Sequence, residues 1–232
     1  MNDREPIKIV NQKPKKQREK EPNPFEAPGI SGTIYSMLHD MVCILAFIVV
    51  FFVLVARLVG VSGSSMYPTL VGANENDDIK KTTGDYLILR SNFISSSYEQ
   101  GDIVVACVPT FENGKPLVKR VIATGGQTVS FRIGEDMQMH VYVDDVLQPE
   151  DYINEPMSPL GLSSDNNSFT VPEGCYYLMG DNRNHSADSR MPNIGAVDER
   201  YIVGKALCLV FPGQDTLEEN KRDFKRLGDI YD

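Results

Sequence analysis

An apolar run from Met41 to Val61 is the feature that most constrains how this 232-residue chain can fold. Its sequence is MVCILAFIVVFFVLVARLVGV, and 20 of its 21 residues are uncharged. At a helical rise of 1.5 Å per residue the run spans roughly 30 Å, which is the thickness of a bilayer core. Arg57 lies one turn from its outer end and can extend to the interface. We therefore predict an uncleaved transmembrane anchor over residues 30–61, because the run is too long for the alternative, a removable signal peptide.

Charge is distributed unevenly along the chain, whose net charge is −9. Residues 1–29 hold seven Lys/Arg and five Asp/Glu, whereas the remainder holds 16 basic and 27 acidic residues. The polar composition of residues 1–29 predicts a disordered tail, and its lysines place this end in the cytoplasm by the positive-inside rule. An acidic body argues against a nucleic-acid binder, which needs a basic face. It indicates a body on the opposite, extracytoplasmic side of the membrane.

After Val61 the helical pattern is replaced by short runs of β-branched residues, separated by turn residues such as Gly125-Gly126 and Glu173-Gly174. This pattern predicts a mostly β fold with antiparallel sheets. Residues 144–168 are rich in polar residues and proline and predict an irregular excursion, and residues 215–232 predict a short amphipathic helix or a solvated end. The predicted strands are Asp85–Arg90, Asp102–Val108, Leu117–Ala123, Thr128–Arg132, Met139–Val143, Phe169–Val171, Cys175–Met179 and Tyr201–Phe211.

Three polar clusters interrupt this pattern, and the first is Val61–Leu70, with the sequence VSGSSMYPTL. A serine on a tight glycine-containing turn can present its hydroxyl and its own N–H toward one point. That arrangement suits a nucleophile that also helps to bind an oxyanion. In isolation the segment is equally consistent with a linker that leaves a membrane helix.

The second cluster is the cationic pair Lys119-Arg120 within an apolar strand. Adjacent strand residues point to opposite faces, so one of the two is expected to face the interior and the other solvent. A buried lysine has a lowered pKa and can act as a general base near neutral pH. The alternative is an edge strand with two solvated cations.

The third cluster is Gly180–Arg190, with the sequence GDNRNHSADSR. Asp188 can pair with Arg190, or Asp181 with either arginine of the cluster. A calcium loop is the alternative, but the spacing misses the EF-hand pattern. His185 is the one histidine placed to serve as a base in a Ser-His-Asp arrangement. No metal site is expected, since the four cysteines form no Cys-x-x-Cys and no Cys/His ligand spacing.

The three clusters, in this order behind an N-terminal anchor, resemble the boxes of bacterial type I signal peptidases over Val61 to about Phe211. Ser65-Met66-Tyr67-Pro68 resembles the nucleophile box, and Gly101–Val105 resembles the strand box that follows it. Lys119-Arg120-Val121 resembles the general-base box, and Gly180–Arg190 resembles the last box. Four boxes in register are far more specific than any one of them.

The resemblance implies a Ser-Lys dyad, with Ser65 as nucleophile and Lys119 as general base. It implies that Ser186 holds the lysine amine, that Asp188 and Arg190 form a supporting ion pair, and that Arg120 is structural. Some relatives carry a serine two residues before the nucleophile to complete the oxyanion hole, whereas this chain has Gly63, as in many Gram-positive-like members. The second oxyanion donor is therefore unassigned, with Ser62 and Ser64 as alternatives. The remaining supporting residues that the boxes imply are Met66, Pro68, Gly180, Asp181 and Asn182.

The resemblance further implies a single-pass cell-membrane serine endopeptidase that removes signal peptides from exported preproteins, with small residues at positions −1 and −3. Its partners would be the lipid bilayer and the secretion machinery, with no nucleic acid and no cofactor. The alternatives are an inactive membrane-anchored assembly factor on the same fold, a self-cleaving repressor-type protease and a tethered binding domain. The expected divisions are a tail (1–29), an anchor (30–61), a catalytic core (62–128 plus 174–213), a β-rich insertion (129–173) and a charged tail (214–232).

Overall fold

The computed structural model describes residues 30–73, 83–93, 97–158, 168–214 and 221–231. The predicted tail over residues 1–29 lies outside these ranges. Helix α1 spans Ile30–Leu54, and its segment Gly32–Leu54 is long and apolar enough to cross a membrane, with a mean hydropathy of 2.6. The chain forms two compact units, and the boundary between them falls within this helix, between Ala46 and Phe47.

Helix α1 ends earlier than the apolar run, and the expectation that the anchor extends to residue 61 is wrong in its last seven residues. Ala56–Gly60 forms strand β1 instead, paired antiparallel with β2 (Tyr86–Ser91). The difference arises because Ala56 and Val61 are buried within the β domain, and pairing with a distant strand leaves no trace in hydropathy. Arg57 consequently lies on a strand and not in the last turn of the helix.

The main sheet has seven strands in the order β1-β2-β11-β3-β4-β9-β10, and the paired strands are antiparallel. Its long strands are rich in valine, isoleucine and leucine, which suit a sheet packed on both faces. Ile103, Val104, Val121 and Leu178 are almost completely inaccessible to solvent. The strands not yet given are β3 (Ile103–Cys107), β4 (Pro116–Thr124), β9 (Cys175–Met179), β10 (Val197–Asp198) and β11 (Ile202–Phe211).

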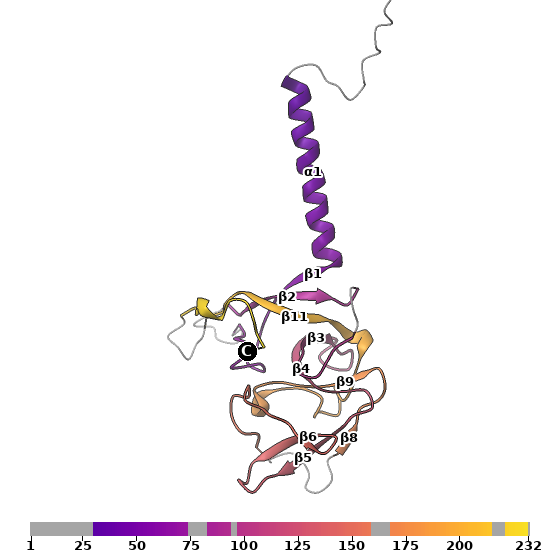
Figure 1. Cartoon of the computed structure of the whole chain (residues 1–232), viewed down its shortest axis with the longest axis vertical. Helices are drawn as coiled ribbons and strands as arrows, with labels where there is room; N and C mark the ends of the chain where they lie inside the picture. The colour runs from indigo at the N-terminus through magenta and orange to yellow at the C-terminus, as the bar shows by residue number, and fades with distance from the viewer. Residues whose placement is uncertain (1–29, 74–82, 94–96, 159–167, 215–220, 232) are drawn as a thin grey trace, which may run out of the picture. The chain divides into compact units, whose positions relative to one another are not determined.

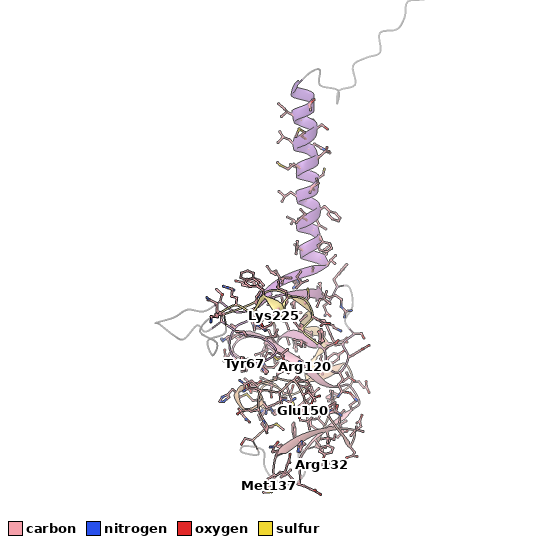
Figure 2. All side chains as sticks on the ribbon, turned by 60° about the vertical axis from the view of Figure 1, so that its left-hand side comes forward. Tyr67, Arg120, Arg132, Met137, Glu150 and Lys225 are labelled. Atoms are coloured by element: carbon pink, nitrogen blue, oxygen red, sulfur yellow. The ribbon has the colours of Figure 1, made fainter. Side chains whose placement is uncertain are left out.

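A second, four-stranded sheet in the order β7-β6-β5-β8 lies on the side of the β domain opposite β1, β2 and β11 (Figure 1). Its side chains pack with those of β4 and β9 in one apolar cluster that includes Val129, Val141 and Tyr177. Figure 2 shows Arg132 and Met137 at its far end. The strands are β5 (Thr128–Ile133), β6 (Met139–Val143), β7 (Val146–Leu147) and β8 (Ser168–Thr170).

The eight predicted strands are all present, with ends that differ by no more than one residue from the expected ones. The described residues 221–231 of the C-terminal segment form no amphipathic α-helix, and most of them are exposed. They contain a single 3-10 turn, Phe224–Arg226, and return to the main sheet. There Ile230 is buried, and Gly228 forms a bridge with Leu209 of β11.

Candidate active site

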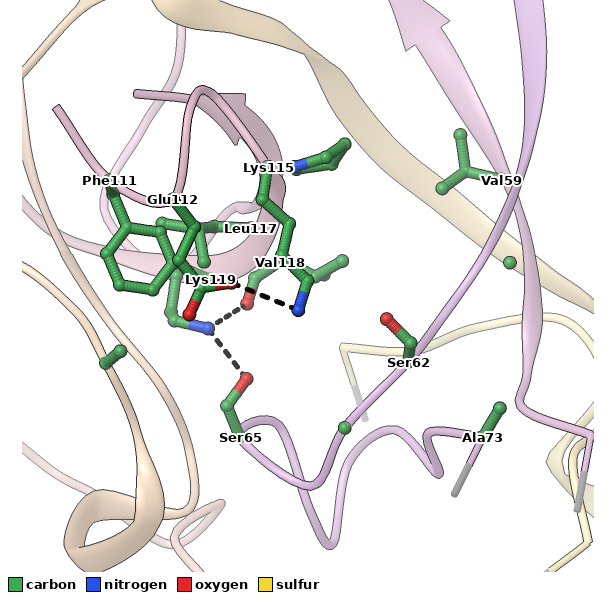
Figure 3. Close-up of a pocket in the computed structure, with 14 residues that line it drawn as sticks. Val59, Ser62, Ser65, Ala73, Phe111, Glu112, Lys115, Leu117, Val118 and Lys119 are labelled. Atoms are coloured by element: carbon green, nitrogen blue, oxygen red, sulfur yellow. Dashed lines mark hydrogen bonds and ion pairs between the residues drawn. The ribbon is translucent and has the colours of Figure 1, made fainter. Parts of the chain in front are cut away.

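The turn that carries Ser65 follows directly after β1 and is fixed at both ends by buried side chains. Met66 and Leu70 are 1% and 0% exposed and belong to the apolar cluster between the turn and the main sheet. The Leu70 N–H donates to the Met66 carbonyl at 2.8 Å, which closes the turn. Gly63 has φ +73°, a conformation that glycine adopts readily. The result is a rigid turn with the Ser65 hydroxyl on its open side (Figure 3).

Lys119 lies in the middle of β4, opposite Val104 of β3, and is only 2% exposed. Its Nζ atom donates to Ser65 Oγ at 2.6 Å and to the Val118 carbonyl at 2.8 Å (Figure 3). The lysine and the serine come from segments 54 residues apart in sequence. The structure thus brings together the two residues that the first and second clusters contribute.

The surroundings of Lys119 make its amine lose a proton more readily than the amine of an ordinary lysine does. Burial lowers its pKa to about 8, against the attraction of the Asp188 and Asp181 carboxylates, which raises it. Arg190 contributes a smaller lowering effect. A neutral amine is therefore accessible near physiological pH, as a general base for a serine hydroxyl requires.

The loop of the third cluster holds the backbone of the nucleophile turn. The Asn182 N–H donates to the Ser65 carbonyl at 3.0 Å, and its side-chain amide donates to the Ser64 carbonyl at 3.1 Å. Asp181 accepts a hydrogen bond from Thr69 Oγ1 at 2.6 Å. A Cβ at Gly180 would overlap both the Ser65 carbonyl oxygen and Ser186, so only glycine fits at that position.

Arg120 is buried, and the expectation that one cation of the Lys119-Arg120 pair faces solvent is wrong. Its guanidinium forms two hydrogen bonds with Asp181, at 2.9 and 2.7 Å, and stacks on the Tyr152 ring 4.1 Å away. Asp181 was expected to pair with Arg183 or Arg190, but its partner is Arg120. Strand alternation directs Arg120 away from Lys119, and Tyr152 and Asp181 cover that face.

Asp188 and Arg190 form the expected ion pair, with two hydrogen bonds of 2.8 Å. Burial alone raises the pKa of Asp188. The hydrogen bonds and charge of Arg190, the hydrogen bond from the Gly180 N–H and the proximity of the Ser186 hydroxyl lower this pKa, and the net shift is downward. Ser186 Oγ is buried and forms no hydrogen bond with a described residue. Its bond to the lysine amine is not formed here, and its role stays a prediction.

His185 does not contact the nucleophile. Its ring is 70% exposed and lies 4.0 Å from the Glu155 carboxylate. Within the described ranges no group of three or more His, Cys, Asp or Glu side chains could hold a metal ion. Lys119 is accordingly the base candidate in contact with Ser65.

Sequence reasoning missed three residues that support the site. Glu150 and Tyr152, from the irregular excursion, contact Arg183, and Tyr152 also covers Arg120; Figure 2 labels Arg120 and Glu150 within the domain. Arg226, from the C-terminal segment, donates to the Thr69 carbonyl at 3.0 Å and pairs with buried Asp85 at 2.7 Å. The sequence shows charged residues in the excursion and in the C-terminal segment, and this is the one signal that could have pointed to them. It does not identify which residues distant in sequence they pair with.

A pocket of about 430 Å³ opens beside Ser65 and Lys119. Its wall combines polar and apolar side chains, with the ion pair Glu112–Lys115 at 3.2 Å on one side (Figure 3). Its other lining residues are Val59, Gly60, Ser62, Gly63, Ala73, Phe111, Pro116, Leu117, Val118 and Ala187.

Fold and site together define a β-sheet protein with an N-terminal apolar helix and a half-buried serine in contact with a buried lysine. The family model described as "Signal peptidase, peptidase S26" matches residues 34–211, and the chain belongs to this family. The family and helix α1 together indicate a membrane-anchored protein.

Individual relatives agree with the family. Signal peptidase I of Mycobacterium tuberculosis is 36% identical over 139 residues, covering 55% of this chain and 47% of the relative. Signal peptidase I T of Bacillus subtilis is 33% identical over 159 residues, covering 66% and 72%. A crystal structure of a signal peptidase I from Enterococcus faecalis is 30% identical, covers 47% of this chain and 96% of its own, and has a TM-score of 0.36. The chain spans about half the length of the first relatives that it matches.

Proposed function

We propose that this protein is a membrane-anchored serine endopeptidase that removes signal peptides from exported preproteins. The observation that carries the proposal is the 2.6 Å contact between Lys119 Nζ and Ser65 Oγ, both of which line a pocket of about 430 Å³. Membership of the signal peptidase family supports the same reaction. The Ser-Lys dyad needs no metal or cofactor for amide hydrolysis.

The reaction proceeds through an acyl-enzyme. Neutral Lys119 takes the hydroxyl proton of Ser65 while Ser65 Oγ attacks the scissile carbonyl carbon. As the C–N bond breaks, the Lys119 ammonium gives that proton to the leaving amine. Lys119 then takes a proton from water, which attacks the ester, and returns it to Ser65 when the acyl group leaves as a carboxylic acid, which releases its remaining proton to solvent.

The supporting residues keep the dyad in position. Asp188, fixed by Arg190, and Asp181, fixed by Arg120, place negative charge near Lys119 without contacting it. This limits how far burial lowers the pKa of Lys119 and keeps the amine basic enough to accept a proton. In this proposal Ser186 orients the lysine amine during the reaction. Its hydroxyl is buried and has no hydrogen-bond partner among the described residues, so it is available for this contact.

The substrate class follows from the pocket wall and the family. Apolar side chains such as Val59, Ala73 and Leu117 line the pocket beside the dyad. Such apolar side chains are compatible with small apolar residues at positions −1 and −3 of a signal peptide, as the family resemblance implies. The Glu112–Lys115 pair adds a polar wall to the same pocket.

The placement in the membrane and the domain divisions belong to the same proposal. One crossing by α1, with residues 1–29 in the cytoplasm, would bring the site to the extracytoplasmic face, where the secretion machinery delivers signal peptides. The second sheet, which runs from Thr128 to Thr170, supports an insertion near 129–173 between the two parts of the catalytic core.

The test is cleavage of a purified preprotein by the full chain in detergent. We expect cleavage after a signal peptide with alanine at −1 and −3, and none when both are leucine. Ser65→Ala and Lys119→Ala should abolish cleavage, whereas His185→Ala should retain it. Full activity of Lys119→Ala would refute the dyad, and an inactive wild-type protein would favour the assembly-factor alternative.

A further inference from the structure

The proposed reaction requires hydrogen-bond donors for the oxyanion that forms when Ser65 attacks. Two preorganised donors aimed at one point are the usual arrangement, and each strengthens as negative charge develops. The Ser65 N–H is one such donor, because it has no acceptor among the described residues. Gly63 has no side chain to supply the second, so that donor must come from elsewhere in the turn.

The neighbouring groups of the turn are unsuitable as the second donor. The Gly63 N–H already donates to the Ala73 carbonyl at 3.1 Å. Ser64 is exposed and does not line the pocket, and its carbonyl is held by the Tyr67 N–H and the Asn182 amide. Lys119 faces the Ser65 hydroxyl and is needed as base.

Ser62 has the properties that the second donor needs. It lines the same pocket as Ser65 and Lys119, and Figure 3 shows its hydroxyl directed into that pocket. Neither its hydroxyl nor its N–H has a hydrogen-bond partner among the described residues. A donor with no competing partner can turn toward a bound carbonyl without breaking an existing bond.

The backbone of Ser62 is held in place although its side chain is free. Ser62 and Ala73 form a parallel bridge, in which the Ala73 N–H donates to the Val61 carbonyl at 3.0 Å and the Gly63 N–H donates to Ala73. The side chain therefore starts from a fixed backbone, the Cα–Cβ bond sets the position of Oγ, and the Cβ–Oγ bond turns the hydrogen toward an acceptor. Preorganisation of this kind is what makes an oxyanion donor effective.

We propose that the Ser62 hydroxyl is the second oxyanion donor and thus a further catalytic residue; this inference rests on the proposed function. In the attack step the C=O double bond becomes a C–O⁻ single bond, and Ser62 donates a hydrogen bond to that oxygen. Ser62 neither gains nor loses a proton. A donor that acts on the developing charge lowers the barrier and has little effect on substrate binding.

The decisive variants are Ser62→Thr and Ser62→Val, which have the same shape and differ in the hydroxyl. Steady-state cleavage of the preprotein by the full chain should show kcat reduced about 10²-fold to 10³-fold in Ser62→Val and Ser62→Ala, with KM changed by less than about threefold. Ser62→Thr should retain kcat within about tenfold of wild type. Ser64→Ala should change kcat much less than Ser62→Ala does.

A thermal unfolding curve for each variant separates chemistry from folding, and Ser62 is exposed enough to tolerate all three changes. Wild-type kcat in Ser62→Val, or equal losses in Ser62→Thr and Ser62→Val, would overturn the inference and leave the proposed function intact. If the wild-type protein did not cleave the preprotein and behaved like Ser65→Ala, the proposed function would be overturned, and the inference with it.

Discussion

Asn182 is bonded to the peptide unit that follows Ser65, since its N–H donates to the Ser65 carbonyl at 3.0 Å. Its side-chain amide donates to the preceding carbonyl, that of Ser64, at 3.1 Å. One residue of the third cluster thus holds two consecutive carbonyl groups of the nucleophile turn. Lys119 of β4 holds the Ser65 hydroxyl, so the direction of Ser65 is set by a strand and a loop that are distant in sequence.

Replacement of Asn182 by alanine should lower activity more than stability. The variant loses the side-chain hydrogen bond to Ser64 and retains the backbone bond to Ser65. A hydrogen bond contributes about 1 kcal/mol, so we expect kcat to fall about fivefold to tenfold with little change in Tm. Preprotein cleavage and thermal unfolding measure the two effects.

The matched control for this prediction is Asn184→Ala. Asn184 lies in the same loop and also makes hydrogen bonds, donating to the Pro156 carbonyl and accepting from the Ser158 N–H, but it does not contact the nucleophile turn. We expect its kcat to stay within about twofold of wild type. Equal kcat losses in the two variants would show that the loop acts on Ser65 as a whole and not through Asn182.

The pH dependence of cleavage should report the titration of Lys119. The base must be neutral, and its pKa is about 8, so kcat/KM should rise with pH and level off above about 8. A rate profile from pH 6 to pH 10 tests this. A profile whose shape changes in His185→Ala would contradict the lysine assignment.

Periodicity and composition were sufficient for the strands, because β6 alternates between buried and half-buried residues and β4 is a short run rich in β-branched residues that is buried on both faces. They were insufficient at Ala56–Gly60, since an apolar edge strand that continues an apolar helix has the same hydropathy as the helix. The dyad residues were predicted because the boxes resemble a known family. Spacing alone did not reveal that Lys119 and Ser65 touch.

The missed residues have a common physical cause. Tyr152 lies in a segment with no regular structure, and Arg226 lies in a densely charged tail that reads as solvated. Both act through contacts with buried carboxylate or guanidinium groups elsewhere in the fold. Such pairings depend on tertiary geometry, and a single sequence does not specify which charged residues are buried.

Removal of Arg226 should destabilise the catalytic domain. Asp85 is fully buried, accepts hydrogen bonds from the Val71 and Gly213 N–H groups, and relies on Arg226 for its countercharge. Arg226→Ala leaves that carboxylate unpaired, and we expect a loss of about 2–3 kcal/mol in unfolding free energy. Denaturant unfolding measures it.

Arg222→Ala is the matched control for Arg226→Ala. Arg222 lies in the same C-terminal segment and donates to the Pro212 carbonyl, but it forms no ion pair with Asp85. We expect a loss below about 1 kcal/mol. If Asp85→Asn/Arg226→Ala were as unstable as Arg226→Ala alone, the explanation from an unpaired buried carboxylate would be wrong.

Replacement of Lys119 by methionine should abolish activity and raise stability at neutral pH. The pKa of Lys119 falls from 10.5 in the unfolded chain to about 8 in the folded protein, so below pH 8 both states are protonated and the folded state carries the full cost of a buried ammonium. Between pH 8 and 10.5 the unfolded chain binds more protons, so wild-type stability rises with pH and the cost disappears. A shift of this size corresponds to about 3 kcal/mol, and the loss of the hydrogen bonds to Ser65 and Val118 reduces the net gain to about 1–2 kcal/mol. Denaturant unfolding at pH 7 and pH 10 should show a gain for Lys119→Met that shrinks at the higher pH, whereas a gain independent of pH would indicate better packing and not relief of a buried charge.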